Sequence, residues 1–123
     1  MRRVAGTRIY MAPEMLRQAH SYNTKADMWS MGILLYIMLT GCVPFGERDP
    51  EKLNKLIMEG KIDQLPLRVI NPSSLAKSLL HEMLIMDPNH RISAHDALKH
   101  PFITQKTYPC NIFFPLKQYK TRL

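Results

Sequence analysis

The chain has 123 residues and a net charge of +7, with 46% apolar and 22% charged residues. This length suits one small domain, and the composition excludes a disordered chain. The charge would suit a nucleic-acid partner, but no nucleic-acid-binding motif and no interleaved aromatic pattern accompanies it, so an ordinary basic surface is expected. The N-terminus lacks the apolar run of a signal peptide. Cys42 and Cys110 show no metal spacing, which indicates reduced thiols of a cytoplasmic protein, a nuclear location also being compatible.

Residues 1–12 show no helical period and are predicted to form an extended loop. Pro13 then begins a short helix that runs through Arg17, because proline suits a first helical position. A polar loop over residues 18–23 leads to the next element.

Residues 26–39 are the most apolar stretch, and no charged side chain occurs between Asp27 and Glu47. Apolar side chains fall on every side of a helix drawn through this stretch, so such a helix needs cover all round. Its 14 residues are too few to span a bilayer, which takes about 20, and no membrane partner is expected. We predict a buried central helix that begins near Thr24 and stops at Gly41.

The second half of the chain contains three further helix signals. Asp49 and Pro50 begin a helix that closes at Gly60, and residues 61–70 are expected to be irregular. Another helix begins at residues 71–73 and ends at 87–88. The last is short: it starts with Ser93 and Asp96 as a capping box, runs through Ala97 and Leu98, and stops before Pro101. With no strand alternation anywhere, the predicted fold class is all-α, with one domain over residues 1–103 and a C-terminal extension over 104–123.

Three blocks of this sequence resemble serine/threonine protein kinases of the eukaryotic type. Residues 6–14, Gly-Thr-Arg-Ile-Tyr-Met-Ala-Pro-Glu, resemble the end of a kinase activation segment. Residues 27–32, Asp-Met-Trp-Ser-Met-Gly, resemble the start of the large central helix, and residues 87–102 resemble the last helix of the catalytic domain. The exit from the central helix, residues 39–45, looks most like the calcium/calmodulin-dependent group. The implied fold is part of the helical C-lobe of a kinase, from the activation-segment end to the last helix.

The resemblance implies roles for individual residues. Glu14 and Arg91 correspond to a buried, two-pronged ion pair that ties the activation segment to the final helix. Asp27 is implied to hold the catalytic loop through backbone N–H groups; its simpler role is to start the helix. Trp29 is expected to pack in the core, and Gly32 to allow close approach of a neighbouring backbone.

Two residues are implied to act on the substrate side. Thr7 matches the threonine that, in serine/threonine kinases, bonds to the catalytic aspartate, which favours serine or threonine as the acceptor. Met11 would line the pocket for the residue after the acceptor.

The motifs that handle nucleotide are missing from the sequence. The five glycines, at 6, 32, 41, 46 and 60, form no Gly-x-Gly-x-x-Gly loop, and Val-Ala-x-Lys, His-Arg-Asp and Asp-Phe-Gly do not occur. ATP and Mg²⁺ are cofactors of the full-length family, and this chain by itself is expected to bind neither and to contain no catalytic residue. The five histidines are not arranged as a metal site.

Two functional hypotheses follow. In the first, the chain is a fragment of a serine/threonine kinase that supplies the substrate-binding side. In the second, it is a non-catalytic module that docks on a protein substrate or a complete kinase through the helix over residues 49–60. In both cases the side of the central helix that other parts of a kinase would cover is left open, so we expect marginal stability and self-association through that apolar face.

Overall fold

The computed structural model describes residues 8–17 and 23–105, and the described residues form helices and no strand. This confirms the all-α prediction. The helices are α2 (Pro13–Arg17), α3 (Thr24–Thr40), α4 (Pro50–Glu59), α5 (Leu65–Ile70), α6 (Ser74–Met83), α7 (Ala94–Ala97) and α8 (Pro101–Thr104). The predicted extension over 104–123 lies outside the described residues from position 106 onward.

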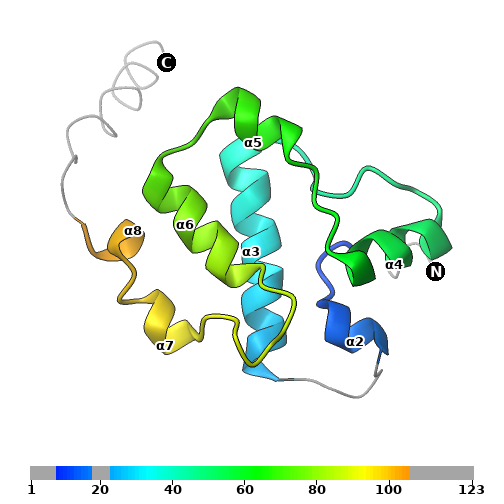
Figure 1. Cartoon of the computed structure of the whole chain (residues 1–123), viewed down its shortest axis with the longest axis horizontal. Coiled ribbons are helices and arrows are strands. Elements are labelled where there is room, and N and C mark those ends of the chain that lie inside the picture. Colours follow the sequence, from blue (N-terminus) through cyan, green and yellow to red (C-terminus); the bar gives the residue numbers. More distant parts are fainter. Residues whose placement is uncertain (1–7, 18–22, 106–123) are drawn as a thin grey trace, which may run out of the picture.

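Helix α3 stands in the middle of the molecule and is the longest helix of the described part (Figure 1). It contacts α5, α6 and α7, while α2 and α4 contact each other beside it. It begins at Thr24, as predicted, and its N-cap is Asn23, whose side-chain oxygen accepts a hydrogen bond from Ala26 N at 2.9 Å. Its C-cap is Gly41, whose φ of 72° lies in the left-handed region that favours glycine.

Two clusters of buried side chains meet on α3. Trp29 and Ile33 pack with Leu53 and Ile57 of α4, and all four are nearly inaccessible to solvent. On another side of α3, Met28 packs with residues of α6 and α7, namely Leu79, Met83 and Ala97. The central helix therefore holds two halves of the fold together, as predicted from its apolar composition.

One side of α3 is open to solvent. Met31, Leu34 and Met38 are 53%, 48% and 78% exposed, and their spacing of three and four residues places them on one face of the helix. This exposed face, Met31–Leu34–Met38, is an apolar side of α3 that the described residues leave uncovered. The helix is apolar all round, but the described residues cover only part of it.

Gly32 allows α6 to approach α3 closely. A Cβ placed on Gly32 would lie 2.7 Å from Leu84 Cδ2 and 2.9 Å from Met83 Cβ. These are side-chain atoms, whereas the resemblance implied a neighbouring backbone.

Four local predictions were wrong. The helix predicted to end at residues 87–88 ends earlier, at Met83. Residues 61–70 contain helix α5, although its N-terminus has no side-chain cap and none of its residues is buried. It rests on α3, so tertiary contact stabilises a segment whose own helix signals are weak. Residues 101–104 form α8, whose N-cap is His100, where the sequence predicted only a stop. Residues 9–10 form a turn, not extended chain, closed by a bond from Met11 N to Arg8 O.

Among the described residues, no helix combines the length and apolar character that crossing a bilayer requires.

Candidate functional site

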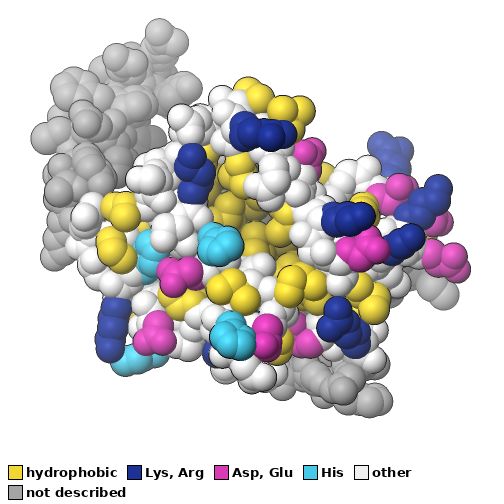
Figure 2. Space-filling model, in the orientation of Figure 1, with side chains coloured by type: hydrophobic (Ala, Val, Ile, Leu, Met, Phe, Trp, Pro, Cys, Tyr) yellow, Lys and Arg dark blue, Asp and Glu magenta, His cyan; other side chains and the backbone are white. Residues whose placement is uncertain are grey.

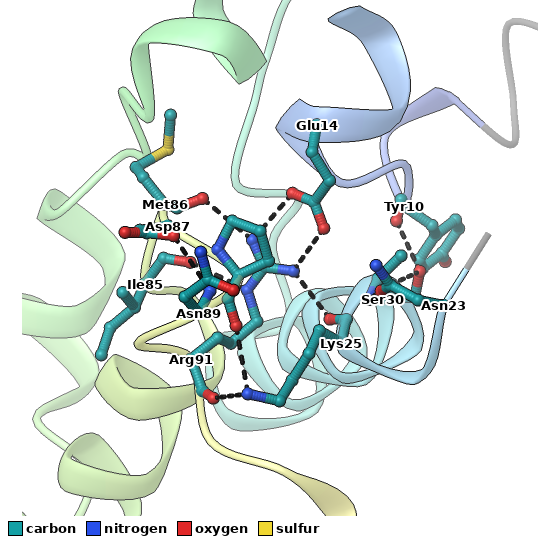
Figure 3. A network of polar contacts seen from close by, with 12 residues as sticks. Tyr10, Glu14, Asn23, Lys25, Ser30, Ile85, Met86, Asp87, Asn89 and Arg91 are labelled. Atoms are coloured by element: carbon teal, nitrogen blue, oxygen red, sulfur yellow. Dashed lines mark hydrogen bonds and ion pairs between the residues drawn. The ribbon is translucent and has the colours of Figure 1, made fainter. Parts of the chain in front are cut away.

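Arg91 lies at the centre of a polar network that joins three distant parts of the chain (Figure 3). Its side chain is fully buried, and its Nη1 and Nη2 atoms each donate to one carboxylate oxygen of Glu14, at 2.8 and 2.9 Å. The structure therefore shows the two-pronged pair between Glu14 and Arg91. A planar guanidinium suits a carboxylate in this geometry, which a lysine ammonium cannot reproduce.

The remaining N–H groups of Arg91 bind backbone carbonyls. Nε donates to Ile85 O at 2.8 Å, Nη1 to Lys25 O at 2.7 Å and Nη2 to Met86 O at 3.1 Å. With the two bonds to Glu14, all five guanidinium hydrogens are used. The ring of Trp29 lies 5.2 Å from the guanidinium carbon, so a cation–π contact covers one side of the group.

Lys25 and Arg91 each donate a side-chain hydrogen bond to the backbone carbonyl of the other. Lys25 Nζ donates to Arg91 O at 2.6 Å and to Pro88 O at 3.1 Å, while the Lys25 carbonyl accepts from Arg91. The two basic residues thus clamp the N-terminal turn of α3 to the turn over residues 87–91. Sequence reasoning missed Lys25; its place two residues before Asp27, at the start of an apolar helix, was the available signal.

The electrostatics favour the ionised pair. Burial opposes ionisation of Glu14, but the bonds and charge of Arg91 outweigh it and hold the pKa of this carboxyl below its ordinary value of 4.5. In the turn over residues 87–91, the bond from Asn89 N and the contact with His90 lower the pKa of Asp87. The carboxylates of Glu14 and Asp87 therefore both keep their negative charge at neutral pH.

The segment before Glu14 is held at several points. Ser30 Oγ of α3 donates to Tyr10 O at 2.7 Å, and Arg8 Nη1 donates to Asn54 Oδ1 of α4 at 2.8 Å. Ala12 and Pro13 are buried, whereas Met11 keeps part of its surface in solvent. Residues 8–14 therefore lie along α3 and α4 in a fixed path. Thr7, predicted to act on the substrate side, lies outside the described residues.

Asp27 lies at the open side of the molecule. Its side chain is exposed at the N-terminal end of the exposed face, and no hydrogen bond to its carboxylate is formed by the described residues. Its spacing of four residues from Met31 places it on the same face. The structure therefore brings Glu14, Trp29 and Arg91 together, places Gly32 at the contact with α6, and leaves Asp27 apart from all of them.

One cluster has the residue types of a hydrolytic triad but not the geometry. His100 Nε2 lies 3.1 Å from Ser78 Oγ and 3.2 Å from Glu82 Oε2, while its Nδ1 accepts a hydrogen bond from Phe102 N at 3.1 Å. In the neutral ring the proton is therefore on Nε2, which must donate and cannot accept the serine proton. Nor do residues 8–17 and 23–105 contain a group of three histidine, cysteine or acidic side chains that could hold a metal ion.

Comparison with known sequences identifies the family. Residues 1–103 match the protein kinase domain family. Serine/threonine-protein kinase 33 of Bos taurus is 38% identical over 119 residues, which cover 94% of this chain and 24% of that protein. The calcium/calmodulin-dependent protein kinase type II alpha chain of Drosophila melanogaster is 39% identical over 102 residues, 83% of this chain and 19% of the relative. The chain thus spans about a quarter or less of the curated relatives it matches.

Solved structures that resemble this chain are also protein kinases. The Rad53 kinase domain, crystallised with AMPPNP, aligns with a TM-score of 0.73 and 38% identity over 81% of this chain and 40% of that one. The twitchin kinase region of C. elegans aligns with a TM-score of 0.74 and 31% identity over 85% of this chain and 18% of the other. The chain therefore belongs to the protein kinase family, and it corresponds to the C-terminal part of a serine/threonine kinase catalytic domain.

Proposed function

We propose that this chain supplies the substrate-binding side of a serine/threonine protein kinase. The observation that carries the proposal is the Arg91 network: five hydrogen bonds from one buried guanidinium fix Glu14 against α3 and the turn over residues 87–91. That anchor holds the end of the activation-segment block, residues 8–14, in one path. A rigid backbone at this point suits a surface that must place a substrate hydroxyl accurately, because phosphoryl transfer depends on positioning.

The chemistry of transfer requires groups that this sequence lacks. A catalytic aspartate, a phosphate-binding lysine and metal ligands are needed to hold Mg-ATP and accept the hydroxyl proton. The sequence contains no His-Arg-Asp or Asp-Phe-Gly block and no glycine-rich loop. We therefore assign no catalytic residue to this chain. We expect ATP and magnesium to bind to the part of a complete kinase that contains those blocks. The residues proposed to position substrate are Thr7 and Met11.

The alternative, a non-catalytic docking module, finds less support in α4. The apolar residues Leu53 and Ile57 of this helix are buried against α3, so they are not free to bind a partner. The outward face carries Glu51, Lys52 and Lys55, all exposed. Docking through α4 would therefore depend on charge and not on its apolar stripe.

A chimaeric kinase tests the proposal. The 102 residues of the Drosophila calcium/calmodulin-dependent kinase chain that align with this protein would be replaced by the matching residues of this chain. Incorporation of radioactive phosphate into serine and threonine peptides, against the same peptides with alanine at the acceptor, measures the activity. We expect the chimaera to phosphorylate the serine and threonine peptides, and the 123-residue chain alone to incorporate none.

The anchor is tested in the same protein. Glu14→Gln in the chimaera should reduce kcat/KM about tenfold or more, because residues 8–14 lose their charged anchor, while Glu59→Gln on the exposed surface should change it little. Binding of a nucleotide analogue shows that each variant is folded. A folded, nucleotide-binding chimaera that transfers no phosphate would refute the proposal, and phosphate transfer by the isolated chain would refute the assignment of catalysis elsewhere.

A further inference from the structure

A groove separate from the Arg91 network lies between α5, α6 and the loop that follows α4. It has a volume of about 630 Å³, which is in the range of ligand-binding sites. Figure 2 shows the apolar recess, bordered by basic side chains and a histidine. None of the groove residues belongs to the kinase motifs described above.

The floor of the groove is apolar. Leu80 of α6 is 3% exposed, and Ile62, Leu67 and Leu84 are partly buried around it. At one end of the groove, α5 ends at Asn71 in the left-handed conformation, with a φ of 51°, and the chain then turns back into α6.

The rim is basic and contains no acid. Arg68 of α5 and Lys77 and His81 of α6 line the groove, and no lining residue is an aspartate or glutamate. Lys77 Nζ donates to Asn71 Oδ1 at 2.8 Å, a neutral partner that leaves the ammonium charge uncompensated. Neither Arg68 nor Lys77 takes part in an ion pair with any other described residue. The groove therefore offers an apolar surface beneath two positive charges that no acidic side chain in the described part of the chain pairs with.

We propose that this groove is a docking site for an acidic peptide segment of a partner protein, with a bulky apolar side chain between carboxylates. The apolar side chain would bury against Leu80 and Leu84, and carboxylates of the peptide would face Arg68 of α5 and Lys77 of α6. A peptide fits better than a small amphiphile, because two basic side chains line the groove and a monocarboxylate neutralises only one positive charge. This site is independent of the proposed kinase role and is measured by binding alone.

Fluorescence anisotropy with the full chain tests the docking site. The probe is a fluorescein-labelled peptide, Glu-Leu-Asp-Phe-Glu-Leu-Asp. Two control peptides replace the acidic residues by lysine or the apolar residues by serine. Only the acidic, apolar peptide should bind, and raising NaCl from about 0.05 to 0.3 M should weaken the binding, because the rim charges are exposed.

Paired variants locate the binding. Arg68→Glu with Lys77→Glu should weaken probe binding about tenfold or more, while Lys52→Glu with Lys55→Glu, the same charge change on α4, should weaken it less than twofold. Circular dichroism checks that both variants keep their helices, and the titration is repeated in the chimaeric kinase so that a folded protein is tested in each case. Equal losses in the two variants, or equal binding of the lysine peptide, would overturn the proposal. Binding of decanoate without binding of the acidic peptide would overturn it as well, in favour of a small anionic amphiphile.

Discussion

Replacing Arg91 by lysine isolates the contribution of guanidinium geometry from that of charge. Arginine uses all five of its N–H groups in this site, toward Glu14 and the carbonyls of Lys25, Ile85 and Met86. An ammonium has three hydrogens at one point, so at least two of the five acceptors lose their donor in a buried setting. At about 1–1.5 kcal/mol for each lost bond, Arg91→Lys should lower the free energy of unfolding by about 2–3 kcal/mol.

Urea unfolding followed by circular dichroism at 222 nm measures this loss. With a slope of about 1–3 kcal/mol per molar urea, the midpoint should fall by about 0.7–3 M, and the free-energy loss is a large part of the stability of a small domain. Glu59→Gln serves as the control, because it breaks an exposed pair with Lys61 whose N–O distance is 3.4 Å, and should shift the midpoint very little. If Arg91→Lys and Glu59→Gln shift the midpoint equally, the Arg91 network does not stabilise the fold as inferred.

Four further predictions concern other parts of the chain. The wild-type chain should be more stable than Glu14→Gln, and this difference in the free energy of unfolding should be fully present above pH 4.5. It should decline as the pH falls through the lowered pKa of Glu14 in the folded state, which urea midpoints at several pH values would show. Burial raises the pKa of Tyr36 from 10.0 to about 12, so wild-type stability relative to Tyr36→Phe should fall between these pH values, which alkaline melting curves would show. Gly32→Ala should cost about 1–3 kcal/mol by overpacking, despite its better helix propensity; an unchanged melting temperature would contradict the close contact with α6. Met38→Glu, at a side chain that is 78% exposed, should reduce self-association in analytical ultracentrifugation, whereas a wild-type chain that stays monomeric at all concentrations would count against that association.

Much of the fold could be predicted because its helices carry local signals. Asp49 accepts from Lys52 N, and Ser93 accepts from Asp96 N, as the capping patterns indicated. The segment over residues 65–70 escaped prediction because it is short and lacks a side-chain cap. Its helical state depends on contact with α3, a long-range interaction that no local pattern contains.

The candidate site was predictable only in part. Glu14 and Arg91 were paired through the family resemblance, since 77 positions separate them and no periodicity relates them. The carbonyl partners of Arg91 were not predictable, because any residue has a carbonyl and only the fold decides which ones converge. The groove between α5 and α6 escaped for a similar reason, as its floor and rim come from segments that show no common motif.

By itself, the sequence determined the family, the helical class and the presence of an apolar central helix, because motifs, caps and hydrophobicity are local properties of the chain. The tertiary structure decided which side of α3 is covered, where the short helices form and which backbone groups meet Arg91. These features depend on interactions between segments that are distant in the sequence. Whether a charge or an apolar face is buried is decided only when those segments pack together.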